Sequence, residues 1–181
     1  MKLLILFGAP AAGKFTVGKV LEERTDFRLF HNHAIMDGVM HIFGKGSPAE
    51  DRLSRLIRES VITEAADAGI DLIFTYVWNF SKDKGKRNID AYKEAYESRG
   101  GEVYFVELTA PVDVRAERAT NPDRFDGKAN TAGPEELKNM EGSQKFVSPT
   151  PFYYLDKYLQ IDTTDKTPAQ IAQQITEWLT A

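Results

Sequence analysis

The residues with the clearest chemical potential form a glycine-rich segment near the start of the chain. The segment Gly8-Ala-Pro-Ala-Ala-Gly-Lys-Phe-Thr16 matches the spacing G-x-x-x-x-G-K, between a short apolar run and a helical pattern. Backbone N–H groups of such a turn can converge on a phosphate, and the start of the next helix adds positive potential. Lys14 can then reach the β- and γ-phosphates of ATP. We expect the nucleotide to be held by Gly8, Ala11, Ala12, Gly13, Lys14, Phe15 and Thr16.

The segment departs from the common pattern at the position that usually holds Mg²⁺. Phe15 follows the lysine where Ser or Thr is usual, and the hydroxyl arrives one residue later, at Thr16. The apolar run Leu72-Ile-Phe-Thr-Tyr-Val-Trp78 also ends without a carboxylate that could hold the water shell of a metal. Thr16 is our predicted Mg²⁺ ligand, with Asp37 as the other candidate, acting through water.

The three histidines are a second group with chemical potential, since His31, His33 and His41 fall within eleven residues. His31 and His33 alternate at the end of an expected strand, so they should share a face. Ligands of doubly wound sheets bind beyond the carboxyl ends of strands, which makes His31 and His33 candidates for binding an acceptor. Asp37 could accept a proton from an acceptor hydroxyl, or could be a surface residue of a helix. A zinc site formed by His31, His33 and Asp37 is a further alternative.

Trp78 lies just past the third apolar run, where its ring could stack on a planar acceptor. The alternative is an aromatic residue that caps the core.

A helical pattern starts at Ser47. Its packed face is predicted from the apolar positions Leu53, Ile57, Val61 and Ala65. Three arginines lie on the opposite side of the same helix, namely Arg52, Arg55 and Arg58.

Alternation of strand and helix patterns predicts an α/β fold with a parallel sheet and helices on both faces. Expected strands are 2–7, 27–30, 71–77, 103–108 and 158–161. Expected helices are 13–23, 47–68, 83–99, 112–119, 134–144 and a last one from 167. Ser47-Pro48 and Thr167-Pro168, each followed by Glu or Gln at the third helical position, are helix-start signals.

Length and composition predict one ordinary globular domain, residues 1–181, with 42% hydrophobic residues. The formal net charge of −4 disfavours a bulk nucleic-acid binder. The chain has no cysteine, which excludes disulfide and thiolate chemistry and is compatible with the cytoplasm. The longest apolar opening, residues 3–7, is too short for a signal peptide or a membrane span.

The loop spacing G-x-P-x-x-G-K-x-T resembles that of adenylate kinases and related nucleoside-monophosphate kinases. Together with Phe30-His-Asn-His33 and Phe74-Thr-Tyr-Val-Trp78, it makes the chain similar to the small P-loop kinases, a group that includes shikimate kinase. The resemblance implies a three-layer P-loop fold with strand order 2-3-1-4-5, ATP as donor and Mg²⁺. Shikimate kinases have acidic residues where this chain has His31-Asn-His33, which argues against shikimate as acceptor.

The resemblance also implies where the remaining parts of the site lie. A mobile lid would span about residues 115–133, and Arg118 and Arg124 would close over the triphosphate in preference to Arg115. A surface arginine pair is the alternative. The acceptor region would span about residues 31–80, where Arg58 could grip an anionic acceptor. The loop after residue 161 would approach the adenine.

We therefore predict an ATP-dependent kinase that acts on a small-molecule acceptor, as a monomer or a homodimer. The acceptor group, a hydroxyl or a phosphate, stays open. A nucleotide-binding switch without an acceptor is the second hypothesis, and the missing carboxylate after residue 78 favours it slightly. A kinase that acts on RNA ends or a cell-wall precursor is a third hypothesis, for which the sequence offers no basic patch.

Overall fold

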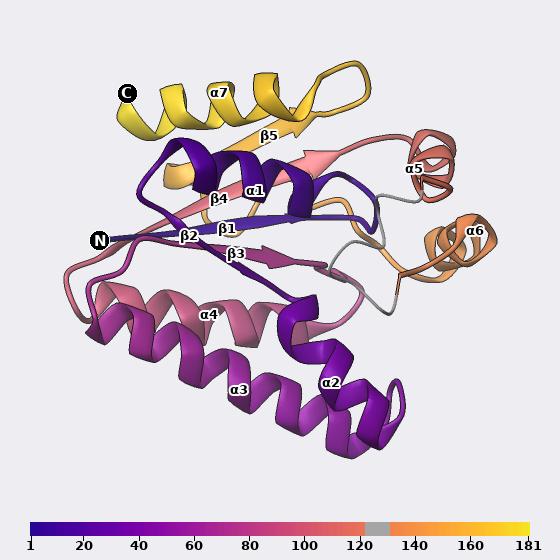
Figure 1. Cartoon of the computed structure of the whole chain (residues 1–181), viewed down its shortest axis with the longest axis horizontal. Coiled ribbons are helices and arrows are strands. Elements are labelled where there is room, and N and C mark those ends of the chain that lie inside the picture. Colours follow the sequence, from indigo (N-terminus) through magenta and orange to yellow (C-terminus); the bar gives the residue numbers. More distant parts are fainter. Residues whose placement is uncertain (122–130) are drawn as a thin grey trace.

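Short apolar runs pair as one parallel sheet in the computed structural model, which describes residues 1–121 and 131–181. The strand order is β2-β3-β1-β4-β5, so the predicted order is confirmed (Figure 1). Continuous apolar runs suit such a sheet because both faces of its inner strands are buried. The strands are β1 (Lys2–Gly8), β2 (Arg28–His31), β3 (Leu72–Tyr76), β4 (Glu102–Thr109) and β5 (Tyr158–Asp162).

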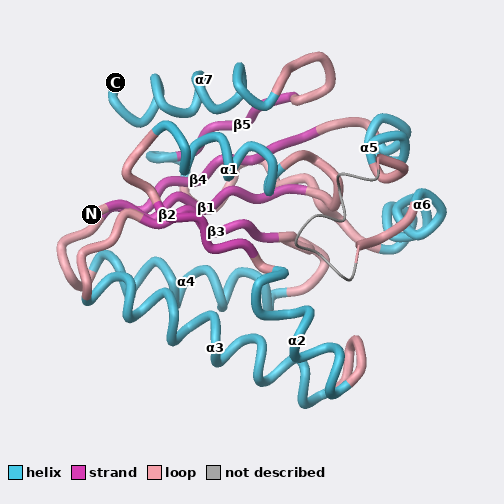
Figure 2. Tube along the Cα trace, viewed as in Figure 1, coloured by secondary structure: helices cyan, strands magenta, loops and turns pink. Residues whose placement is uncertain are grey.

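Helices connect the strands and cover both faces of the sheet (Figure 2). They are α1 (Lys14–Arg24), α2 (His33–Phe43), α3 (Pro48–Asp67), α4 (Asp83–Glu97), α5 (Val112–Arg118), α6 (Pro134–Ser143) and α7 (Pro168–Thr180). Figure 1 shows α1 and α7 on one face, α3 and α4 on the other, and α5 and α6 at one end of the sheet. None of these helices has the length and apolar content needed to cross a membrane.

The side chains of β1 show how the two cores form. Leu3, Ile5 and Phe7 pack with residues of α3 and α4, whereas Leu4 and Leu6 pack with residues of α1 and α7. All five side chains have an exposed fraction of 0%. Successive residues of a strand point to opposite faces, so one apolar run supplies both cores. Full burial of such a side chain contributes about 1.5–3 kcal/mol, which anchors the strand whose end carries the glycine-rich loop.

Both predicted helix-start signals are present. The Ser47 hydroxyl accepts a hydrogen bond from the Glu50 N–H at 3.1 Å, at the start of α3. Thr167 and Gln170 cap α7 reciprocally through their side chains. These contacts satisfy N–H and hydroxyl groups that a helix start otherwise leaves unpaired.

The predicted packed face of α3 is wrong in part: Ala65 is buried and Leu53 is half-buried as predicted, but Ile57 and Val61 are exposed. Its buried side is formed by Ser54, Arg58, Ile62, Ala65 and Ala66 with Glu50, whereas Ile57 and Val61 are 37% and 36% exposed. The sequence pattern identifies the side of the helix with the most apolar residues. In the structure α3 packs against α2 and α4, and its buried side includes polar residues.

Helix α2 was not predicted, and it changes the geometry of the histidine segment. Strand β2 ends at His31, and His33 is the first residue of α2. The expectation that His31 and His33 alternate on one strand is therefore wrong. The start of α2 carries little signal, because Asn32 makes no side-chain cap hydrogen bond there. The helix packs against α3, the next element along the chain, and such tertiary packing usually stabilises a helix more than its capping does.

Candidate functional site

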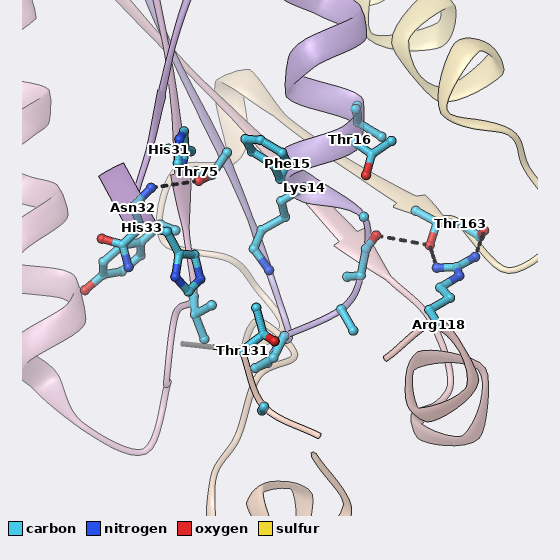
Figure 3. Close-up of a pocket in the computed structure, with 18 of the residues that line it drawn as sticks. Lys14, Phe15, Thr16, His31, Asn32, His33, Thr75, Arg118, Thr131 and Thr163 are labelled. Atoms are coloured by element: carbon cyan, nitrogen blue, oxygen red, sulfur yellow. Dashed lines mark hydrogen bonds between the residues drawn. The ribbon is translucent and has the colours of Figure 1, made fainter. Parts of the chain in front are cut away.

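A cavity of 560 Å³ opens at the carboxyl ends of β1, β2 and β3 (Figure 3). One wall is the glycine-rich loop with the start of α1, and another comes from the end of β2 and the start of α2. Residues of α5, α6 and the segment after β5 complete the cavity. This is where an open parallel sheet binds its ligands, because the loops after neighbouring strands diverge there.

The backbone of the glycine-rich loop adopts conformations that few side chains allow. Gly8, Ala11 and Gly13 have φ angles of +143°, +63° and +95°. A Cβ atom at Gly8 would lie 2.2 Å from the Leu108 carbonyl oxygen, so this position accepts only glycine without movement. A left-handed alanine costs about 1–2 kcal/mol, and such strain is often found where a backbone is shaped for a ligand.

Lys14 contacts the backbone of its own loop. Its Nζ donates to the carbonyl oxygens of Gly8 at 2.9 Å and Ala9 at 2.6 Å. Figure 3 shows the Lys14 side chain extending across the cavity from the start of α1. Phosphate oxygens could take the place of these carbonyl acceptors, with a charge-assisted bond as the gain.

The two residues after Lys14 have different surroundings. The Phe15 ring meets the His31 ring edge to face, with the ring centroids 4.8 Å apart. Thr16 also lines the cavity and brings a hydroxyl oxygen to it. A hydroxyl together with phosphate oxygens forms the hard oxygen donor set that Mg²⁺ prefers, so Thr16 fits the metal and Phe15 does not.

Arg118 lines the cavity beside the segment after β5. Its guanidinium donates to Thr163 Oγ1 at 2.9 Å and to the Thr163 carbonyl oxygen at 2.6 Å. The Thr163 side chain is 1% exposed and its hydroxyl also contacts the Thr109 carbonyl oxygen at 3.0 Å. Arg118 therefore lies between the end of β4 and the segment after β5, the side expected to approach the adenine.

Arg115 is buried, with an exposed fraction of 3%. Its guanidinium donates to the Pro10 carbonyl oxygen at 3.3 Å and to the Ala110 carbonyl oxygen at 3.0 Å, and it pairs with Glu141 of α6. Arg115 thus connects the glycine-rich loop to α5 and α6. It is neither a member of an exposed arginine pair nor a residue that lines the cavity. Arg124 lies outside the described residues.

The side of the cavity where the sequence predicts an acceptor is formed by β2, α2 and β3. His31, Asn32, His33 and Met36 line it together with Thr75, Tyr76 and Val77. The Asn32 backbone N–H donates to Thr75 Oγ1 at 3.2 Å, which joins the ends of β2 and β3. Two oxygen atoms, Asn32 Oδ1 and Thr131 Oγ1, are buried without a hydrogen-bond partner in the described structure. Burial raises the pKa of the Tyr76 phenol, which stays protonated.

His33 and Asp37 form a pair on the first turns of α2. His33 Nδ1 lies 3.2 Å from Asp37 Oδ1, and their side chains are 28% and 17% exposed. His33 lines the cavity, whereas Asp37 is not among its lining residues. The described residues contain no group of three or more His, Cys, Asp or Glu arranged to hold a metal ion, so the zinc alternative gains no support.

Arg58 and Trp78 lie apart from the cavity. Arg58 is 8% exposed on the buried side of α3, close to Tyr76 and Tyr92; burial raises the pKa of both phenols, and the Arg58 charge partly offsets that rise. Trp78 is 1% exposed and stacks on Phe80 with the ring centroids 4.7 Å apart. These surroundings fit the alternative prediction for Trp78, an aromatic residue that caps the core.

Sequence reasoning missed several residues of the cavity. Thr75 and Asn32 lie in segments that were predicted only as a strand and a strand end, and Met36 lies in a segment for which no element was predicted. The helical spacing of the apolar residues from 35 to 43 was the available signal. Lys45 and Glu136 both line the cavity and form an ion pair at 2.8 Å between the α2–α3 loop and α6. No sequence signal joins residues 91 positions apart.

Several solved structures of small kinases have a similar fold. A sugar kinase from Janibacter sp. HTCC2649 matches with a TM-score of 0.67 and 15% identity, over 99% of this chain and 95% of that one. An APS kinase from Mycobacterium tuberculosis, in complex with AMPPNP and APS, matches at 0.64 and 15%, over 99% and 98%. A shikimate kinase from Acinetobacter baumannii with shikimate matches at 0.59 and 19%, over 98% and 92%.

These likenesses confirm the fold class predicted from the sequence, a three-layer α/β fold with a five-stranded sheet of order β2-β3-β1-β4-β5, which the APS kinase and the shikimate kinase resemble. At such low identity they carry the fold alone. No protein-family model and no curated protein matches the sequence.

Proposed function

We propose that the protein is an ATP-dependent kinase that transfers the γ-phosphoryl group to a small-molecule acceptor. One observation carries the proposal: the glycine-rich loop with Lys14 shares a single cavity with the ends of β2 and β3. A kinase needs a triphosphate site and an acceptor site that meet. The sugar kinase, the APS kinase and the shikimate kinase of the same fold support this reading.

The parts of the site would divide the work as follows. Backbone N–H groups of residues 11–16 and the Lys14 ammonium hold the β- and γ-phosphates. Arg118 and Arg124, in a lid of about residues 115–133, offset the charge on the transferring group. Phosphoryl transfer depends mainly on positioning and charge neutralisation, so these groups are sufficient in kind.

Mg²⁺ would bind at Thr16, which lines the cavity and follows Lys14 by two residues. The ion supplies positive charge between the β- and γ-phosphate oxygens. Asp37, the other candidate from the sequence, faces His33 and not the cavity. Thr16 is therefore our proposed metal ligand.

The acceptor would bind against His31, His33 and the ends of β2 and β3, within the region of about residues 31–80. Arg58 and Trp78 are buried and do not line the cavity, so neither is proposed as an acceptor ligand. The net charge of −4 favours a small molecule over nucleic acid as partner. A monomer or homodimer in the cytoplasm fits the cysteine-free composition.

The test is acceptor-dependent ADP release across sugars, nucleosides, nucleoside monophosphates, shikimate-like acids and aminoglycosides. We expect one class to stimulate turnover, and Lys14→Ala to lower kcat/KM by about 10²–10³-fold. Lys82→Ala, an exposed lysine at the start of α4, is the matched control. Unchanged ATP binding and turnover in Lys14→Ala would refute the proposal.

A nucleotide-binding switch is the second candidate, and one observation favours it. Among the described residues that line the cavity, Glu136 is the sole carboxylate, and Lys45 pairs with it. Tight ATP binding without stimulation by any acceptor of the panel would select the switch over the kinase.

A further inference from the structure

We infer that His33 is the general base that takes the proton from a hydroxyl acceptor, and that Asp37 is the positioning residue that orients its ring. The inference rests on the proposed kinase function. It starts from a pair of side chains one helical turn apart on α2, with His33 Nδ1 3.2 Å from Asp37 Oδ1. Sequence reasoning assigned the proton transfer to Asp37 itself, so the structure changes which group performs it.

The contact with Asp37 selects the tautomer of His33. An ionised carboxylate only accepts hydrogen bonds, so Nδ1 carries the hydrogen and donates it to Asp37. In the neutral ring Nε2 is then the unprotonated nitrogen that can accept a proton, and it lies across the ring from Nδ1. A carboxylate placed behind a histidine in this way also stabilises the imidazolium that forms when Nε2 takes up a proton.

The position of the two residues favours His33 as the group that meets the acceptor. His33 lines the 560 Å³ cavity together with Lys14, and Figure 3 shows both side chains pointing into it. Asp37 is one turn further along α2, has a 17% exposed side chain and does not line the cavity. A general base must come within hydrogen-bond reach of the proton it removes, and of the two residues only His33 lines the cavity in which an acceptor would bind.

Other charged and titratable groups share the cavity and belong to every element around it. The described ones are Lys14 from α1, His31 from β2, Tyr76 from β3, Lys45 paired with Glu136, Arg118 from α5 and Lys166 after β5. Of these, Lys14, Arg118 and Lys166 are cations suited to phosphate. His31 has its ring against Phe15, whereas Asp37 supports His33 directly.

The proposed step balances in protons and electrons. The acceptor O–H gives its proton to His33 Nε2, and an electron pair of that oxygen forms the new bond to the γ-phosphorus of ATP. The bond between the γ-phosphorus and the oxygen that bridges to the β-phosphate breaks, and ADP leaves with that electron pair. The proton on His33 passes to solvent after product release.

This role for His33 also indicates the class of acceptor. An alcohol holds its proton at neutral pH, so its transfer benefits from a base. The terminal oxygens of a phosphate monoester are largely ionised there, with a second pKa of about 6, and need none. The choice between hydroxyl and phosphate acceptors, which the sequence left open, therefore falls on a hydroxyl.

The kinetic test compares His33→Gln with His41→Gln, a histidine of the same helix that is exposed and outside the cavity. We expect His33→Gln to lower kcat by about 10²–10⁴-fold with hydroxyl acceptors and to leave ATP affinity unchanged. In the native protein and in His41→Gln, kcat falls at acidic pH as the base becomes protonated. That acidic limb disappears in His33→Gln.

A second measurement reports on the pair without turnover. The chain has three histidines, so ¹⁵N-histidine NMR of the full chain with a non-hydrolysable ATP analogue gives few signals, and single His→Gln variants assign them. We expect the Nδ1–H tautomer for His33 in the native protein, and its loss in Asp37→Asn. The same variant should lower kcat by about 10²-fold, with the acceptor KM little changed.

The outcomes separate this inference from the proposed function. If Lys14→Ala abolishes acceptor-dependent turnover but His33→Gln keeps the native kcat and acidic limb, the protein is a kinase and the base assignment is wrong. An Nε2–H tautomer of His33, or turnover confined to phosphate acceptors, would overturn it as well. If no acceptor stimulates the native protein, both proposals fail.

Discussion

Replacing Gly8 with alanine tests how closely the end of β1 is fitted against β4 where the glycine-rich loop begins. Gly8 has a φ angle of +143°, and an added Cβ atom would lie 2.2 Å from the Leu108 carbonyl oxygen. That oxygen belongs to the backbone of a central strand, so it cannot move aside as a flexible side chain would. The substitution must displace one strand end relative to the other.

The expected magnitude has two parts. The backbone conformation costs an alanine about 1–3 kcal/mol, and overpacking against a rigid neighbour costs about 1–3 kcal/mol more. Gly8→Ala should therefore lose about 2–6 kcal/mol of the free energy of unfolding. Gly69→Ala is the matched control, because Gly69 also has a positive φ, of +68°, but no atom within 4 Å of the added Cβ. It should lose about 1–2 kcal/mol, the backbone part alone.

Urea denaturation of the native protein and both variants measures these losses at constant m-value. Both variants place an alanine at positive φ, so the difference between their losses contains the clash with Leu108 together with the difference in backbone cost between a φ of +143° and one of +68°. Equal losses in Gly8→Ala and Gly69→Ala would show that the end of β1 has room for a side chain, and the described loop geometry would then be wrong.

Two further predictions concern buried polar groups. Glu107 is 0% exposed and accepts a hydrogen bond from the Ser148 hydroxyl at 2.7 Å, so Ser148→Ala should destabilise the fold by about 1–3 kcal/mol in the same assay; no loss would contradict the contact. Burial raises the pKa of five tyrosine phenols above the ordinary value of 10.0, namely Tyr76, Tyr92, Tyr96, Tyr154 and Tyr158. A raised folded-state pKa means that their contribution to stability is complete below pH 10 and is lost above it, so tyrosinate absorbance of these groups should appear together with alkaline unfolding. Ionisation of all tyrosines near pH 10 in the folded protein would contradict this.

Much of the fold could be predicted because its signals are local. The apolar runs of β1 and β3, the loop with Lys14 and the caps at Ser47 and Thr167 are each encoded within a few neighbouring residues. The alternation of strands and helices predicted a parallel sheet, because few other packings fit that pattern. The strand order within the sheet came from the resemblance to small P-loop kinases. Helix α2 was not predicted because no capping side chain marks its start, and its packing against α3 is a tertiary contact.

The candidate site was predictable in part. Lys14, Thr16, His31 and His33 line the cavity as proposed from the sequence. Arg58 and Trp78 do not, because the sequence shows how far apart two residues are along the chain but not which side of a helix or loop faces the sheet. Nothing in the sequence shows whether Arg58 is buried beside Tyr76 and Tyr92 or lines a cavity where it could bind an anion.

The sequence by itself determined that a phosphate-binding loop follows the first strand of a parallel α/β sheet, because that information lies in consecutive residues. Only the tertiary structure decided which groups meet across the cavity: Arg118 with Thr163, Lys45 with Glu136, and His33 in front of Asp37. The end of β2 at His31 turns the chain into α2, and this turn makes Asp37 the support of a histidine. Such roles depend on direction in space, which packing between distant segments sets and residue spacing does not.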